Sequence, residues 1–145
     1  MIALLDTNII LQNQIRKKTP IPPDSFISIV TVGELESLAL QLNWGYQKQT
    51  TLTSLLNSVP VIDIDSNIAK LYGFVDAYSQ GKILANPLPI GMTARNMGKN
   101  DLWIAATAVY YDIELHTTDN DFDHLVNIGL KLNKVVWRRS VFRRL

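Results

Sequence analysis

Five short apolar runs, separated by segments with helical periodicity, constrain the fold of this chain more than any other feature of its sequence. We expect each run to form a β-strand and each intervening segment to contain a helix. The predicted strands are residues 2–5, 26–30, 59–64, 113–117 and 134–137. The predicted helices are residues 7–14, 32–43, 46–57, 67–78 and 101–111. Continuously apolar strands that alternate with helices are typical of an α/β fold, in which helices cover both faces of a parallel sheet.

The composition is that of a globular protein, with 47% hydrophobic and 19% charged residues among 145. We see no repeat and no linker, and we expect residues 1–145 to form a single domain. The absence of cysteine excludes disulfides, thiolate zinc sites and a cysteine nucleophile. No apolar run approaches the roughly 20 residues of a membrane span, and residues 1–12 lack the basic start of a secretory signal. We therefore expect a cytoplasmic protein that does not enter a membrane.

Five carboxylates fall where the predicted strands end. Asp6 follows the first strand directly, Glu34 comes four residues after the second, and Asp119 and Asp121 come just after the fourth. Asp101 opens the almost wholly apolar helix that leads into the fourth strand. In open parallel sheets, ligands bind beyond the carboxyl ends of the strands. We therefore expect these side chains to meet at one edge of the sheet.

Carboxylates gathered in this way repel one another unless a cation lies among them. Oxygen donors without a His–Cys set favour Mg²⁺ or Mn²⁺ over zinc. Such an ion orients a water molecule and neutralises charge on a phosphate, which is the requirement of phosphodiester cleavage. The sequence therefore favours a metal-dependent nuclease.

Each acid also has a structural explanation. Asp6 could cap the helix that follows it, and Thr31-Val32-Gly33-Glu34 fits a capping box. Asp101 could complement a helix dipole, and Asp119 and Asp121 could be turn and cap residues.

The ordered motifs of the chain resemble those of PIN-domain nucleases, and its size and spacing resemble the VapC toxins of toxin–antitoxin pairs. The matching segments are Asp6-Thr7-Asn8, Glu34 in T-V-G-E-L, Asn100-Asp101-Leu102-Trp103-Ile104-Ala105-Ala106, and Thr118-Asp119-Asn120-Asp121-Phe122. The resemblance extends from Met1 to about Leu125. It implies a three-layer α/β/α sandwich with a central parallel sheet.

The resemblance also implies a Mg²⁺ or Mn²⁺ site. Asp6, Glu34, Asp101 and Asp119 match the acidic positions of the family, and Asp121 matches a more variable one. Thr7, Asn8 and Thr118 match polar positions near the metal. Members of the family often form homodimers, and a VapB-like antitoxin silences them by inserting a segment into the acidic groove.

Together these observations predict a metal-dependent endoribonuclease, the toxin of a toxin–antitoxin pair. Asp6, Asp101 and Asp119 would hold the metal, Glu34 would hold it or orient the attacking water, and Asp121 would support them. The net charge of +1 gives no strong nucleic-acid signal. Local basic groups could steer the RNA backbone. These are Arg95, Lys99, and Arg138, Arg139, Arg143 and Arg144 near the C-terminus.

Two alternatives remain open at this point. A non-catalytic scaffold could keep the fold and bind RNA or a protein. The second is a phosphatase with an aspartyl nucleophile, which requires the pattern Asp-x-Asp after the first strand. This chain has Asn8 in place of the second aspartate.

The histidines and two of the tryptophans carry further expectations. Neither His116, in the fourth strand, nor His124, on a helix surface, is expected to be catalytic. We expect Trp103 in the core or a dimer interface, and Trp137 is the better candidate for stacking on a base.

Overall fold

A five-stranded parallel sheet organises the computed structural model, which describes residues 2–17 and 20–135. The strands are β1 (Ala3–Leu5), β2 (Ser25–Ser28), β3 (Val61–Ile62), β4 (Glu114–Thr117) and β5 (Lys131–Lys134). Their order is β3-β2-β1-β4-β5, and every neighbouring pair is parallel. The chain builds outward from β1 to β3 and then returns to place β4 on the other side of β1. The crevice at such a reversal is the usual ligand site of an open α/β sheet.

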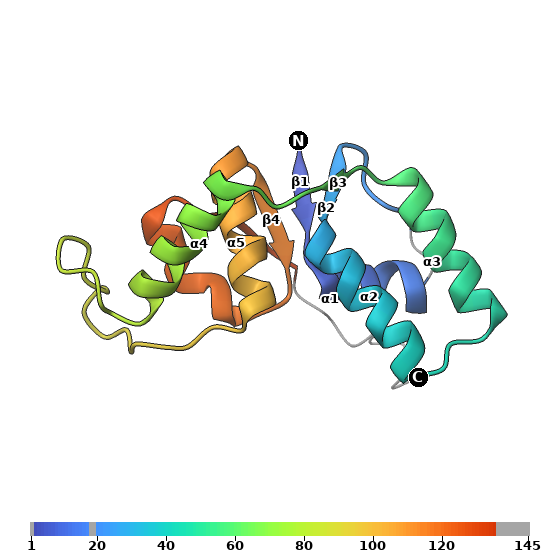
Figure 1. Ribbon diagram of the computed structural model, residues 1–145, viewed down its shortest axis with the longest axis horizontal. Coiled ribbons are helices and arrows are strands. Elements are labelled where there is room, and N and C mark those ends of the chain that lie inside the picture. Colours follow the sequence, from blue (N-terminus) through green and yellow to red (C-terminus); the bar gives the residue numbers. More distant parts are fainter. Residues whose placement is uncertain (1, 18–19, 136–145) are drawn as a thin grey trace, which may run out of the picture.

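Helices cover both faces of this sheet, as predicted (Figure 1). On one side lie α1 (Thr7–Ile9), its continuation as the π-helix η1 (Ile10–Arg16), α2 (Ile29–Gln41) and α3 (Tyr46–Ser58). On the other side lie α4 (Ser66–Ser79) and α5 (Lys99–Tyr111). A 3₁₀-helix, η2 (Asn120–Ile128), connects β4 to β5. The segment between α4 and α5 is irregular, and it falls between the helices predicted at residues 67–78 and 101–111.

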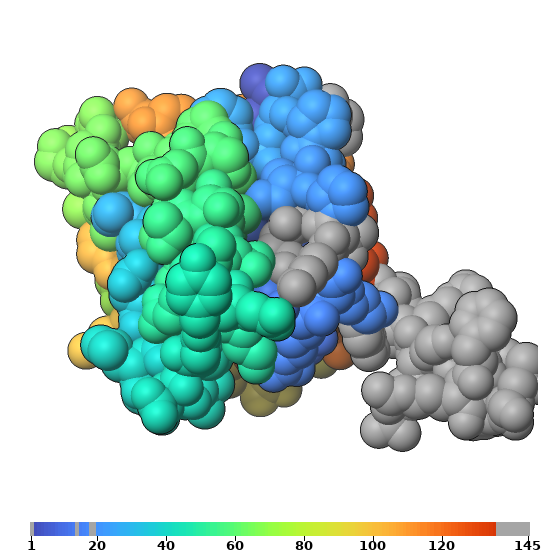
Figure 2. Space-filling view, turned by 90° about the vertical axis from the view of Figure 1, so that its right-hand side faces the viewer, coloured from blue at the N-terminus to red at the C-terminus, as the bar shows by residue number. Residues whose placement is uncertain are grey.

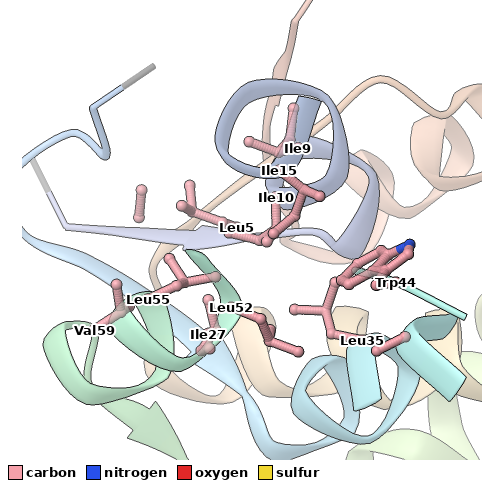
Figure 3. Close-up of a cluster of buried hydrophobic side chains, with 12 residues drawn as sticks. Leu5, Ile9, Ile10, Ile15, Ile27, Leu35, Trp44, Leu52, Leu55 and Val59 are labelled. Atoms are coloured by element: carbon pink, nitrogen blue, oxygen red, sulfur yellow. The ribbon is translucent and has the colours of Figure 1, made fainter. Parts of the chain in front are cut away.

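The two faces of the sheet bury separate apolar clusters. Leu5 points into the cluster beneath α1, α2 and α3, where Leu35, Leu52 and Trp44 surround it (Figure 3). Its neighbour Leu4 points to the opposite face, into the cluster beneath α4 and α5. Both leucines are fully buried, because successive side chains of a central strand alternate between two covered faces. The α/β/α sandwich predicted from the sequence is therefore confirmed. Figure 2 is viewed from the side of α3, which forms the outer surface of the layer that also contains α1 and α2.

The second helix begins three residues earlier than predicted. Ser28 ends β2 and caps α2, because its hydroxyl accepts a hydrogen bond from the backbone N–H of Val30 at 3.1 Å. The helix therefore starts at Ile29, and Thr31 and Glu34 lie within it. The capping box that Thr31-Val32-Gly33-Glu34 suggested is wrong, since Ser28 already fills the N-cap.

The predicted position of the last strand, which rests on an apolar run, is also wrong. We predicted it at residues 134–137, whereas β5 is Lys131–Lys134, paired in register with Glu114–Thr117 of β4. This strand lies at the edge of the sheet, where one face stays exposed, and its burial alternates along Lys-Leu-Asn-Lys. An edge strand does not need a continuous apolar run, which explains the error. Trp137 lies outside the described residues.

Three further expectations can be compared with the fold. His124 is buried at 2% exposure, so its predicted position on a helix surface is wrong. Its Nε2 lies 2.8 Å from Ser79 Oγ, and its ring stacks on Tyr78, because η2 packs against the end of α4. His116 lies in β4 as predicted, with Nε2 2.7 Å from Glu114 Oε1. In the described part of the chain, no helix has both the length and the apolar character to cross a membrane.

Candidate metal centre

Three carboxylates converge at the carboxyl edge of the sheet, beside the end of β4. Asp101 lies in the first turn of α5, Asp119 caps η2, and Asp121 lies in the first turn of η2. Each offers one oxygen, and these oxygens all lie within 4.8 Å of one another. Such a spacing allows a single cation to contact all three side chains.

The turn after β4 fixes two of these acids. Asp119 donates its backbone N–H to Thr117 Oγ1 at 3.0 Å, and its Oδ1 accepts the backbone N–H of Asp121 at 2.9 Å. The capping explanation for Asp119 is therefore correct. Capping uses one carboxylate oxygen and leaves the other available, so it does not compete with a metal-binding role.

Asp6 lies at the base of the cluster and is 3% exposed. Its Oδ1 accepts the backbone N–H of Thr7 at 2.8 Å, and its Oδ2 accepts the hydroxyl of Thr117 at 2.7 Å. The strand register produces this contact, because β1 and β4 pair Leu5 with His116 and so place Asp6 beside Thr117. Asp6 is thus both a helix cap and a buried acid at the sheet edge.

Glu34 reaches the same edge from α2. The hydroxyl of Thr7 donates to Glu34 Oε1 at 2.7 Å and lies 3.2 Å from the hydroxyl oxygen of Thr31. Thr7 is itself buried directly after Asp6. It therefore connects the acid of β1 to the acid of α2.

The electrostatics show that the acids act on one another. Burial, together with the charges of Asp6, Asp119, Glu34 and Asp121, raises the pKa of Asp101 from its usual 3.8 to about 7. Burial also raises the pKa of Asp6, against the lowering effect of the hydrogen bonds from Thr117 and Thr7, and the charges of Glu34 and Asp119 add to the increase. Carboxylates that raise one another's pKa values in one cluster are stabilised by a bound cation.

One cation of the chain lies at the rim. Arg95 Nη1 is 3.9 Å from Asp121 Oδ1, and both side chains are partly exposed. The backbone N–H of Arg95 donates to the carbonyl of Ser79 at 2.8 Å, which fastens this part of the irregular segment to the end of α4. Arg95 therefore stands beside the acids on the solvent side. The C-terminal arginines lie outside the described residues.

The structure brings the five acids predicted from the sequence together at one edge of the sheet. The three that lie together differ from the three expected to hold the metal. Asp121, expected only to support the site, is one of the three whose oxygens are mutually closest, while Asp6 and Glu34 are coupled to Asp101 through their charges. The hydroxyl that holds Asp6 belongs to Thr117, which the sequence did not indicate, whereas Thr118 was the residue singled out. The donors are all carboxylate oxygens, so they suit a hard divalent cation.

Comparisons with known proteins agree on the fold. A family model described as the PIN domain matches residues 3–127. No curated protein matches the sequence. The structure of VapBC2 from Rickettsia felis bound to a DNA fragment from their promoter aligns with a TM-score of 0.69 and 24% identity, covering 94% of this chain and 100% of that one.

Two further solved structures are similar. VapBC-5 from Mycobacterium tuberculosis, of the VapBC family of toxin–antitoxin systems, has a TM-score of 0.64 and 24% identity and covers 93% of this chain and 100% of that one. VapBC-1 from nontypeable Haemophilus influenzae has a TM-score of 0.63 and 23% identity and covers 92% and 98% respectively. At these identities the likeness concerns the fold.

Proposed function

This chain belongs to the PIN domain family, and we propose that it is a Mg²⁺- or Mn²⁺-dependent endoribonuclease, the VapC-type toxin of a toxin–antitoxin pair. The observation that carries the proposal is the convergence of Asp101, Asp119 and Asp121 within 4.8 Å at the switch point of the sheet. The raised pKa of Asp101 supports it, because like charges held this close favour a bound cation.

The residues divide between holding the ion and supporting those that hold it. Asp6, Asp101 and Asp119 are the proposed principal ligands, and Asp121 adds a fourth carboxylate on the exposed side. Thr117 and Thr7 orient Asp6 and Glu34 by the hydrogen bonds described above. Residues that fix the ligands in this way usually matter almost as much as the ligands themselves.

A divalent ion, when bound, supplies Lewis acidity that neutralises charge on a phosphate and makes a bound water more acidic. Glu34 helps to hold that ion, or accepts a hydrogen bond from the attacking water and so orients it. Arg95, beside Asp121 at the rim, pairs with an oxygen of the RNA backbone in place of the carboxylate. Lys99, in the first turn of α5, adds positive charge on the same side.

We propose a VapB-like antitoxin as the regulatory partner and a homodimer as the working form. The similarity to VapBC-5 supports the partner, since that protein is a member of the VapBC family of toxin–antitoxin systems. A basic side chain of such a partner would find the same anionic edge that a metal would occupy.

Cleavage of total cellular RNA by the purified protein tests the proposal. We expect fragments with Mn²⁺ or Mg²⁺, none after EDTA, and recovery when the metal is added in excess. RNA binding without cleavage under any of these conditions would instead favour the non-catalytic scaffold.

A pair of substitutions on one helix makes the test specific. Glu34→Gln should reduce cleavage strongly, because it removes a negative charge from the cluster. Glu36→Gln changes an exposed side chain on the same helix and should leave cleavage unchanged. Equal activity of the two variants would contradict the proposed role of Glu34.

A further inference from the structure

A groove of about 510 Å³ opens next to the acidic cluster, between α2 and the beginning of α5. Its lining includes Gly33, Glu34, Ser37 and Gln41 from α2, and Asn100 and Trp103 from α5. Glu34 belongs to both features, because it forms part of this wall and its charge also acts on Asp101. Asn100 precedes Asp101 directly. The groove therefore adjoins the candidate metal centre at Glu34 and Asn100.

Trp103 provides an aromatic surface in this groove. It is partly exposed although α5 is otherwise largely buried, and its ring packs on Tyr72 of α4, with centroids 4.2 Å apart. Contact with Tyr72 holds the indole in place from another helix. An aromatic ring fixed by its neighbours and open to a groove is the feature on which unpaired bases stack.

The remaining lining combines the apolar side chains of Val30, Leu38 and Ile64 with neutral polar groups. Gln41 Nε2 donates to Ser37 Oγ at 2.7 Å, and Asn100 is exposed at the opposite wall. Amide and hydroxyl groups can both donate and accept hydrogen bonds, as the edges of nucleobases do. Glu34 is the only charged residue among the described residues that line the groove. This lining therefore suits a flat, polar-edged, uncharged group better than a phosphate.

We propose that the groove between α2 and α5 is a subsite for one unpaired nucleobase of the RNA, stacked against Trp103, with Asn100 and the Ser37–Gln41 pair at its edge. The proposal rests on the proposed function, because the groove adjoins the carboxylates at Glu34, so that a base bound in it would lie next to the phosphodiester that is cut. A base can stack on a side chain only when it leaves its own helix, so the groove would accept a base that is not paired.

A substitution at Gly33 can fill the groove while every other residue that lines it stays unchanged. A Cβ at this position would have no heavy atom of the surrounding structure within 4 Å. Gly33→Leu should therefore fold and project its side chain into the space proposed for the base. Gly33→Ala is the matched control, since alanine favours the helix and adds only a methyl group.

The experiment measures binding rather than cleavage. Asp101→Asn protein, with no further change or with Gly33→Ala, Gly33→Leu or Trp103→Leu, is titrated into labelled single-stranded oligoribonucleotides. Each oligonucleotide carries one abasic residue, moved along the sequence, and fluorescence anisotropy reports affinity. Circular dichroism verifies that each variant is folded.

We expect one abasic position to weaken binding by roughly five- to 100-fold in the Gly33→Ala protein, the range associated with one stacked base. That position-specific loss should disappear in both Gly33→Leu and Trp103→Leu. Annealing the intact oligonucleotide to its complement should remove the part of the affinity that depends on Gly33 and Trp103. Identical abasic profiles in all four proteins would overturn the proposal.

The outcomes separate this inference from the proposed function. Metal-dependent cleavage with no dependence of binding on Gly33 or Trp103 would overturn the subsite and leave the nuclease. If the abasic effect depends on Trp103 but the wild type cleaves no RNA with either metal, the base subsite stands and the nuclease is overturned. A change in sedimentation of Gly33→Leu with unaltered RNA binding would overturn the subsite and identify the groove as a contact between copies of the chain.

Discussion

The two ends of α5 carry the same residue type in opposite surroundings. Asp101, in the first turn, lies partly buried among other carboxylates, and its pKa is raised to about 7. Asp112, just after the last turn, is exposed and pairs with Lys131 at 3.1 Å. One acid repels its neighbours and the other is compensated by a cation in water. The two ends of α5 therefore differ in charge compensation, because neighbouring acids raise the pKa of Asp101 whereas a lysine pairs with Asp112.

Substitution of these two aspartates should give the largest contrast. Asp101→Asn is expected to reduce RNA cleavage roughly 100-fold or more, as loss of a group that stabilises charge in the transition state commonly does. Asp112→Asn should leave cleavage within about twofold, because asparagine tolerates the left-handed backbone at φ 53°. Initial rates with Mn²⁺ measure both. Comparable losses in the two variants would remove the distinction between the ends of α5.

The stability of the metal-free protein should depend on pH through Asp101. Its pKa is higher in the folded chain than in the unfolded one, so its contribution to stability is present at low pH and is lost as pH rises through about 7. Burial lowers the pKa of His124 and acts in the opposite direction only below about pH 6.5. We therefore expect the free energy of unfolding of the wild type, relative to that of Asp101→Asn, to fall between about pH 4 and about pH 7 and to level off above that range.

Mn²⁺ should restore the stability lost in this interval, since it favours the ionised form of the cluster. Urea unfolding with and without the metal measures the effect. Asp101→Asn should flatten the dependence, whereas Asp112→Asn should retain it. A metal-free wild type that becomes more stable relative to Asp101→Asn over the same interval would contradict a raised pKa of Asp101.

Removing the hydroxyl beneath the cluster should have an intermediate effect. Thr117→Val deletes the donor to Asp6 Oδ2, so the pKa of Asp6 should rise further and Mn²⁺ affinity should fall by about tenfold. Thr107→Val is the control, because Thr107 is equally buried and donates to the carbonyl of Trp103 within α5. Calorimetric titration at several pH values compares them. The same affinity in both variants would show that Asp6 does not depend on Thr117.

A substitution at the exposed C-terminal end of α5 should change stability least. Lys131→Gln removes the ion pair with Asp112, in which both side chains are more than half exposed. Exposed pairs of this kind contribute less than about 1 kcal/mol, and less in high salt. Urea unfolding should therefore show little loss of stability. A large loss would mean that the two ends of α5 differ less than their exposure indicates.

The sequence predicted the sheet and the edge where the acids gather because both depend on local patterns. Apolar runs indicate where strands end, and Asp6, Asp119 and Asp121 follow those ends directly. Parallel pairing then brings them to one side of the sheet. The start of α2 was missed because Ser28 and Thr31 are both suitable caps, and burial of the helix face decides between them.

Other features depend on packing that no local pattern records. Thr117 meets Asp6 only because β4 pairs with β1 in one particular register. His124 is buried because η2 turns back against α4, although Asp123 directly before it is exposed. Trp103 lines a groove because α2 and α5 approach each other from different layers. Tertiary contacts therefore decide these positions.

Binding of Mn²⁺ to the metal-free protein tests the central claim most directly. Loss of the electron paramagnetic resonance signal of free Mn²⁺ gives the stoichiometry and affinity without RNA or turnover. We predict saturable binding to the wild type and to Asp112→Asn, and strongly weakened binding to folded Asp101→Asn. Equal binding by all three proteins, or none by the wild type, would contradict a divalent ion held by the carboxylates at this edge of the sheet.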